Sequence, residues 1–216
     1  MKVTNYSLDM HKHLLASWAA SSAASQSGFR FRVEVGKELL LLASSGNNTS
    51  NEGFIEYIKE IKTFKDHKDF DNWHSKTIKM MRTDGPGFKK ILEKINKTKK
   101  KKLDKKDYSY GVAAKLLNVY LKVFFLDDFE SDFASFIHPP IDRLLLVELL
   151  EKESEIFNFD PELFKHTGLI GEKKIPNWTK INSEEYNEII KLIRKFIESK
   201  NLTGLWRIEY AWKGHQ

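Results

Sequence analysis

The sequence predicts a mainly α-helical protein that carries a small β-hairpin or sheet near its N-terminus. Apolar residues recur at helical spacing over most of the chain after position 54. Before that point, the segment "FRFRVEV" at 29–35 alternates apolar with charged residues, which is typical of a strand. Hydrophobic residues make up 41% of the chain and aromatic residues 12%, too many for a disordered protein. We therefore expect one folded unit over 1–216.

The charge balance and the residue types that are missing narrow the possible functions. Lys and Arg total 36 against 30 Asp and Glu, and the resulting net charge of +6 favours a polyanionic partner. The chain has no cysteine, which excludes disulfides, thiol nucleophiles, cysteine zinc sites and cysteine-ligated iron–sulfur clusters. The sequence shows no signal peptide and no run of about 18 apolar residues. We expect a monomeric, cytoplasmic protein that does not contact a membrane.

The N-terminal part, 1–50, is expected to hold one helix and the hairpin. Residues 8–26 are alanine-rich with apolar side chains at helical spacing, which fits a helix packed closely on a neighbour, with Trp18 in the core. The stretch "FRFRVEVGKELLLLAS" that follows is typical of two strands joined by a turn at "GK".

The remaining part, 51–216, is expected to be a series of helices. The first of these helices would begin near Phe54, and the next would contain Trp73 in the core. Two more would cover 88–96 and 111–126, and two would begin at Asp142 and at a Ser183 cap. A short helix containing Trp206, Tyr210 and Trp212 would end the chain. Asp142 is expected as an N-cap because its side chain can accept from exposed amides, and the two prolines before it preset the entry of the chain.

A lysine-dense stretch, "KTKKKKLDKKD" at 97–107, precedes the most informative motif. Such a run is either a solvated charge run or a site of phosphate contact. Its position directly before Tyr108 favours contact, and the residues predicted to bind DNA are Lys99, Lys100, Lys101 and Lys102.

The motif itself, "YSYGVAAKLLNVYLK" at 108–122, places Lys115 near the start of an apolar helix. Desolvation penalises the ammonium form of lysine, and a neutral lysine amine can attack a sugar carbon and form a Schiff base. A carboxylate is then needed to take up protons and stabilise positive charge, and Asp142 is the candidate, 27 residues downstream. The alternatives are a snorkelling lysine on a partly exposed helix and an aspartate that acts only as an N-cap.

These residues carry a resemblance to a known family. "YGVAAKLLNVYLKVF" resembles the second half of the helix-hairpin-helix motif of the DNA glycosylases that are named after it, and "PPID" at 139–142 is similar to their apolar segment that ends in aspartate. The resemblance implies that Lys115 is the catalytic lysine and Asp142 the catalytic aspartate. It also implies a two-lobed helical fold with DNA bound by the motif. The predicted DNA-binding residues here are Gly111, Val112, Ala113 and Arg143, with Ala113 replacing the second glycine of the family's hairpin.

The absence of cysteine points to the branch of this family without an iron–sulfur cluster, which is typified by 8-oxoguanine glycosylases. The resemblance implies a DNA glycosylase that acts on double-stranded DNA and has Schiff-base lyase activity. The substrate would be an oxidised purine, or a hypermodified phage base in antiviral defence. Two alternatives stay open: a non-enzymatic helical nucleic-acid-binding protein, and a helical toxin or partner-binding module.

Residues for substrate binding are predicted at two places. His138 lies close to Asp142 in sequence, where it could orient substrate or contact phosphate. A base-flipping enzyme also needs flat apolar surfaces around the extruded base, and Trp206, Tyr210 and Trp212 are candidates for that pocket. The seven histidines show no metal-binding spacing, so we predict no catalytic metal and no cofactor.

Overall fold

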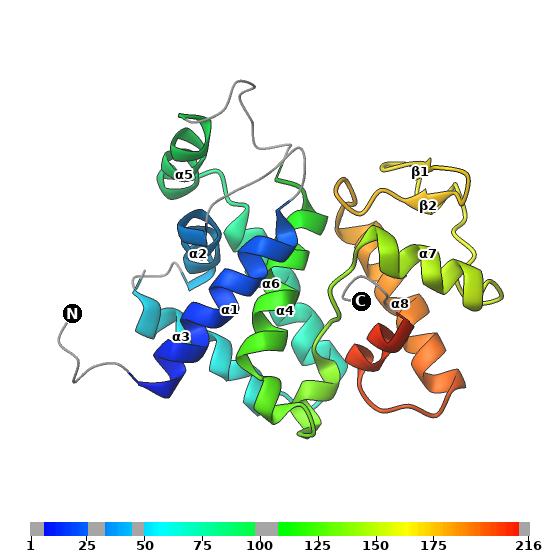
Figure 1. Ribbon diagram of the computed structural model, residues 1–216, viewed down its shortest axis with the longest axis horizontal. Helices are drawn as coiled ribbons and strands as arrows, with labels where there is room; N and C mark the ends of the chain where they lie inside the picture. Colours follow the sequence, from blue (N-terminus) through cyan, green and yellow to red (C-terminus); the bar gives the residue numbers. More distant parts are fainter. Residues whose placement is uncertain (1–6, 26–32, 45–49, 98–107, 212–216) are drawn as a thin grey trace.

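The computed structural model describes residues 7–25, 33–44, 50–97 and 108–211, and these are mostly helical (Figure 1). The α-helices are α1 (Leu8–Ala24), α2 (Val33–Leu41), α3 (Asn51–Lys59), α4 (His67–Met81), α5 (Pro86–Asn96), α6 (Tyr110–Phe124), α7 (Arg143–Lys152) and α8 (Ser183–Ser199). Short 3-10 helices are η2 (Leu42–Ser44), η3 (Glu60–Thr63), η5 (Leu126–Asp128), η6 (Asp132–Phe136) and η7 (Leu205–Ala211). The prediction of a mainly α-helical protein is confirmed.

The first helix, α1, packs against α6 through small side chains (Figure 1). Ala16, Ala20 and Ala24 are spaced by four residues and fully buried, so the two helix backbones can approach closely. Trp18 lies off this face and is 60% exposed, so its assignment to the core is wrong. Trp73 on α4 is only 6% exposed, which confirms its place in the core.

The predicted hairpin is wrong over residues 33–44, which form α2 followed by η2. Val35, Gly36, Leu39 and Leu40 are all buried, and their spacing is that of one helical face. The "GK" that the hairpin prediction places in a turn therefore lies inside a helix. Burial of this stripe outweighs the local alternation that favours strands. Residues 29–32 lie outside the described part of the chain.

The β-structure within the described ranges lies late in the sequence instead. Strands β1 (Leu169–Ile170) and β2 (Ile175–Pro176) pair antiparallel, with Ile170 opposite Ile175. Gly171 follows β1 with a φ of +71°, in the left-handed region that glycine adopts without steric cost. This small sheet lies next to α7 (Figure 1).

Helix α6 lies in the middle of the molecule and contacts α1, α2, α4 and α8 (Figure 1). The Ser109 side chain caps it by accepting from the amide of Val112. Every residue from Tyr110 to Leu121 is buried, including Lys115. The alternative of a surface lysine that snorkels to solvent is therefore excluded for Lys115.

Two further helices begin close to α6. Asp142 is the N-cap of α7, as predicted, and its side chain accepts from the amide of Leu145 at 2.9 Å. The cap of α8 is Asn182 rather than Ser183, because Asn182 and Glu185 form a reciprocal capping box. Of the helices that are described, none has both the length and the apolar character needed to cross a membrane.

Candidate active site

Lys115 and Asp142 meet inside the protein. The Nζ atom of Lys115 lies 3.1 Å from Oδ2 of Asp142, and the two side chains are only 8% and 10% exposed. Lys115 comes from the second turn of α6, and Asp142 comes from the extended segment that leads into α7. The geometry therefore joins the two residues that the sequence indicates as a nucleophile and its carboxylate partner.

The Asp142 carboxylate serves two partners with its two oxygens. Oδ1 accepts from the Leu145 amide as the helix cap, and Oδ2 accepts from Lys115. Because the cap fixes one oxygen, the other is held in a constant direction toward α6. The capping role and the predicted chemical role are compatible in one side chain.

Trp178 covers the ammonium group of Lys115. The Nζ atom lies 4.5 Å from the centroid of the Trp178 ring, within the range of a cation–π contact. Trp178 lies in the segment between β2 and α8 and is half-buried. Sequence reasoning missed this residue, because nothing local in "IPNWTKIN" marks it as a neighbour of a lysine 63 positions earlier.

Gly111 makes room for the segment that carries Trp178. A Cβ atom at position 111 would lie 1.9 Å from the backbone oxygen of Trp178 and 2.8 Å from the Ile181 side chain. The Gly111 amide also donates to the backbone oxygen of Ile181 at 3.3 Å. The glycine therefore permits a close approach of two backbones, and this approach brings the Trp178 ring to Lys115 one helical turn further along.

The amides that were predicted to bind DNA phosphate are engaged within the protein. Besides the Gly111 amide, the Val112 amide donates to Oγ of Ser109 and the Ala113 amide donates to the Ser109 backbone oxygen. All three residues are buried in the first turn of α6. In this conformation, Gly111, Val112 and Ala113 build the helix start and have no amide free for a phosphate.

Asn118, one turn after Lys115, connects α6 to the segment before Asp142. Its Nδ2 atom donates to the backbone oxygen of Pro139 at 2.9 Å and to Oη of Tyr186 at 2.8 Å. Its Oδ1 atom lies 2.8 Å from Nε2 of His74. Asn118 and Lys115 thus hold the same extended segment at two points, and this fixes the position of Asp142 relative to α6.

His138 belongs to the same buried network. Its Nε2 atom lies 2.9 Å from Oδ1 of Asp71, and its Nδ1 atom lies 3.2 Å from Oη of Tyr186. Arg194 donates to the same oxygen of Asp71 at 2.7 Å. His138 is buried and both of its ring nitrogens are bonded, so it has no nitrogen free to contact substrate.

The network is self-consistent when both histidines are neutral. Asn118 uses both amide hydrogens, so Tyr186 accepts from it and donates to Nδ1 of His138, which leaves the Nε2–H of His138 to donate to Asp71. Burial lowers the pKa of His138 and of His74, in agreement with this assignment. Burial would raise the pKa of Asp71, but the hydrogen bonds from His138 and Arg194 hold it well below its usual range.

The C-terminal aromatic residues lie in a different place. Trp206 and Tyr210 line a cavity of about 600 Å³ that also includes Lys122 and Phe129. Lys122 is on the same face of α6 as Lys115 but two turns further along, at a distance of about 10 Å along the helix axis. The cavity therefore does not include the Lys115–Asp142 pair, and Trp212 lies outside the described residues.

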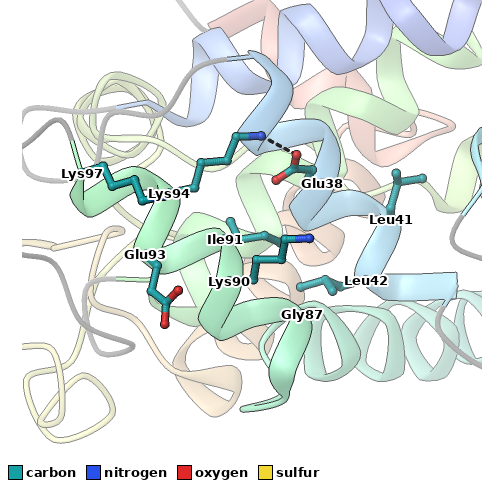
Figure 2. A pocket seen from close by; sticks show the side chains of 9 residues that line it. All are labelled: Glu38, Leu41, Leu42, Gly87, Lys90, Ile91, Glu93, Lys94 and Lys97. Atoms are coloured by element: carbon teal, nitrogen blue, oxygen red, sulfur yellow. Dashed lines mark hydrogen bonds and ion pairs between the residues drawn. The ribbon is translucent and has the colours of Figure 1, made fainter.

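A second cavity lies between α2 and α5 (Figure 2). It has a volume of about 780 Å³, and Figure 2 shows Lys94 paired with Glu38 across it, at 2.6 Å. Lys90 and Lys97 supply further cations, but Glu93 lines it too, so its charge is mixed. Neither Lys115 nor Asp142 contributes to this cavity.

The remaining predicted DNA contacts are only partly described. Lys99, Lys100, Lys101 and Lys102 lie outside the described residues, and Arg143 is the exposed first residue of α7. Over residues 7–25, 33–44, 50–97 and 108–211, no three His, Asp or Glu side chains are grouped so that they could hold a metal ion.

No protein-family model, no curated protein and no solved structure matches the chain. The function is therefore inferred from the arrangement of the side chains, and above all from the contact between Lys115 and Asp142.

Proposed function

We propose that the protein is a DNA glycosylase that removes a flipped base and forms a Schiff base with the sugar through Lys115. The observation that carries the proposal is the 3.1 Å contact between the Lys115 amine and the Asp142 carboxylate in a nearly closed site. Two groups for which the sequence predicts complementary chemical roles are adjacent although 27 residues separate them.

The contact supports a simple route to a reactive amine. A protonated lysine has no lone pair for attack, and transfer of one proton from Nζ to Oδ2 of Asp142 leaves a neutral amine. The amine then forms a bond to C1′ of the deoxyribose while the glycosidic bond breaks. The departing base takes the electron pair of the broken bond and the proton that Asp142 had accepted, so Asp142 is ionised again. A nucleophile and a proton acceptor within hydrogen-bond distance are what this step requires.

The later steps also use the pair. After the base has left, the amine bound to C1′ loses a proton, O4′ gains one as the sugar ring opens, and a positively charged imine remains. The ionised form of Asp142 stabilises this charge in surroundings that contain little water. Loss of a C2′ proton with cleavage of the C3′–O bond would then nick the strand and release the phosphate as leaving group.

Access to the amine requires a movement of Trp178. The indole ring lies over Nζ, and the ammonium is nearly excluded from solvent. Base-flipping enzymes hold the extruded base against flat apolar side chains, and a displaced Trp178 supplies such a surface beside C1′. Trp178 is therefore proposed as the aromatic partner of the flipped nucleotide, in a better position than Trp206 or Tyr210.

Two observations support DNA as the partner. The chain carries a net charge of +6, which favours a polyanion. Arg143 is exposed in the first turn of α7, directly after Asp142. An exposed arginine next to Asp142 is well placed to contact a phosphate of the strand that enters the site.

The proposal is tested by base release from duplex DNA. Duplexes with 8-oxoguanine and phage DNA with hypermodified bases are incubated with the parent protein and with Lys115→Gln and Asp142→Asn. The proposal predicts release of one free base by the parent and none by either variant. If Lys115→Gln still releases base while Asp142→Asn does not, the carboxylate activates water and the covalent mechanism is wrong.

One observation favours a second candidate, a nucleic-acid-binding protein without enzymatic activity. The Lys115–Asp142 pair is nearly closed to solvent and Asp142 caps α7, as expected of a structural ion pair. This candidate predicts DNA affinity that decreases steeply with salt, no base release, and affinity that Lys115→Gln leaves unchanged.

A further inference from the structure

A polar cleft lies beside the first residue of α6, apart from the Lys115–Asp142 pair. It has a volume of about 420 Å³ and is bounded by the C-terminal half of α4, the first residue of α6 and the first residue of α8. Its lining consists of hydroxyl groups and cations, namely Ser75, Lys79, Arg82, Thr83, Tyr110 and Ser183. The lining contains no carboxylate, unlike that of the cavity between α2 and α5.

Arg82 is the strongest sign that an anion belongs in this cleft. Its Nε atom donates to the backbone oxygen of Tyr108 at 3.0 Å, which fixes the guanidinium group at the edge of the cleft. The side chain is half-buried, and this burial lowers the pKa of Arg82. No ion pair joins Arg82 to a carboxylate of the described residues, so its charge is partly desolvated without a described counter-ion.

Lys79 adds a second cation one turn earlier on α4. It is exposed, and within the described ranges it has no ion pair. Two neighbouring cations repel each other, and an anion placed between them removes that repulsion. Lys79 lies in the last turn of α4 and Arg82 is the C-cap residue three positions later, so both side chains can reach the same anion.

The hydroxyl groups supply directional donors. Burial raises the pKa of Tyr110 to about 12, so its hydroxyl group keeps its proton at neutral pH, and it is hydrogen-bonded with Ser75. Ser183 is exposed in the first turn of α8, where backbone amides also lack helical partners. Thr83 donates its own hydrogen to the Lys79 backbone oxygen, so its contribution is to fix the wall of the cleft.

We propose that this cleft is a phosphate-binding site, with Arg82 and Lys79 as the charged ligands and Ser75 and Ser183 as hydroxyl donors. Arginine and hydroxyl groups are the side chains that proteins use most for phosphate oxygens. The cleft, with a volume of about 420 Å³, is large enough for a phosphate group and for part of the molecule that carries it. The phosphate comes either from the DNA backbone or from a free nucleotide.

The site does not depend on the chemistry proposed for Lys115. Tyr110 and Lys115 are separated by about 7.5 Å along the α6 axis and point to different faces of the helix. If the phosphate belongs to DNA, the inference rests on the proposed function. The cleft then binds the DNA backbone in place of the amides of Gly111, Val112 and Ala113. If it belongs to a free nucleotide, the cleft is a separate ligand site.

The experiment measures binding of three probes: a fluorescent duplex with one abasic site, adenosine monophosphate, and inorganic phosphate. Lys79→Gln and Arg82→Gln are compared with Lys76→Gln, which removes an exposed lysine from the same helix outside the cleft. We expect each cleft variant to weaken binding by about tenfold, and to reduce the slope of log affinity against log salt by about one. Lys76→Gln is expected to bind like the parent.

One further variant keeps the test decisive. Arg82→Gln loses the bond to Tyr108 and can unfold, so Ser183→Asp, which places a negative charge in the cleft, is measured beside Lys79→Gln. Binding of the duplex alone identifies a backbone phosphate, and binding of adenosine monophosphate identifies a free nucleotide. The proposal is overturned if Lys79→Gln and Ser183→Asp bind all three probes as Lys76→Gln does.

The outcome can be separated from that of the proposed function. Lys115→Gln is expected to lose base release and to keep its affinity for the duplex. The cleft variants are expected to lose affinity and to retain base release at saturating DNA. Failure of one prediction therefore leaves the other intact.

Discussion

The backbone oxygen of Trp178 lies 1.9 Å from the position that a Cβ atom of residue 111 would occupy. Only glycine permits this approach, and through it the indole ring of Trp178 reaches the Lys115 amine from a distant part of the chain. The start of α6 therefore has two functions. It presents the lysine, and it admits the segment that covers it.

Gly111→Ala should destabilise the fold, since the added methyl group meets a backbone oxygen that cannot rotate away. We expect a loss of at least about 1–3 kcal/mol in the free energy of unfolding, measured by guanidinium titration. Gly85→Ala is the control, since a Cβ there has no neighbour within 4 Å, and as a change at the N-cap of α5 it should cost less than about 1 kcal/mol. Equal effects of the two substitutions would contradict the close approach.

Trp178→Ala should expose the Lys115 amine, because the ring now covers it at 4.5 Å from the centroid. Reductive methylation with formaldehyde, followed by mass spectrometry, should label Lys115 faster in this variant than in the parent. Trp178→Phe should give an intermediate rate. Trp206→Ala is the control, because Trp206 lines a cavity that does not include Lys115. The role of Trp178 as a cover is wrong if both alanine variants label Lys115 equally.

Asn118→Ala should loosen the segment that carries Asp142. The substitution leaves the Pro139 oxygen and the His74 nitrogen without their present partner, and each orphaned buried group costs roughly 1–3 kcal/mol. Asn187→Ala on the exposed face of α8 is the control and should change stability by less than about 0.5 kcal/mol.

A positioning role for Asn118 also predicts slower chemistry in protein that is still folded. Base release by Asn118→Ala, measured well below its melting temperature, should be reduced at saturating DNA while the affinity for DNA is unchanged. An unchanged rate would show that Asn118 contributes to stability alone.

Acid should destabilise the protein through its buried histidines. Burial lowers the pKa of His74 and His138, and it lowers that of His13 to about 4. As the pH falls below about 6.5, these histidines bind protons in the unfolded chain but not in the folded protein. The free energy of unfolding therefore decreases from that pH downward. The midpoint of guanidinium unfolding should be similar at pH 8 and pH 6.5 and lower at pH 5.

Two variants check the origin of this pH dependence. His74→Asn removes one buried histidine and should flatten the decrease between pH 6.5 and pH 5. His166→Asn replaces an exposed histidine and should leave the decrease as it is in the parent. A stability that stays constant between pH 8 and pH 5 would mean that the histidines are not buried as described.

Much of the helical order could be predicted from the sequence because amphipathic spacing and caps are local signals. The helix over 111–126, the cap at Asp142 and the core position of Trp73 are examples. The strand prediction for 33–44 is wrong because alternation and helical spacing overlap in a short apolar stretch, and burial decides between them. The prediction of Ser183 in place of Asn182 as a cap is wrong because both are good caps and lie side by side.

Of the candidate site, too, one part could be predicted from the sequence and another part could not. Lys115 and Asp142 could be found from residue types and from a resemblance, whereas their contact with Trp178 depends on how β2 and α8 fold back onto α6. The place of His138 in a buried network could not be inferred from its position before two prolines, since its partners Asp71 and Tyr186 come from two other helices. Long-range packing, which no local pattern encodes, determines these neighbours.

The central claim is tested most directly by borohydride trapping on duplex DNA with one abasic site, which does not require the excised base to be known. We expect a covalent complex with the parent protein, with the crosslink at Lys115 by mass spectrometry. Lys115→Arg keeps a cation beside Asp142 without a nucleophilic amine, and it should fold but form no complex. Absence of a complex with the parent, or trapping of Lys115→Arg as efficiently as the parent, would contradict the claim.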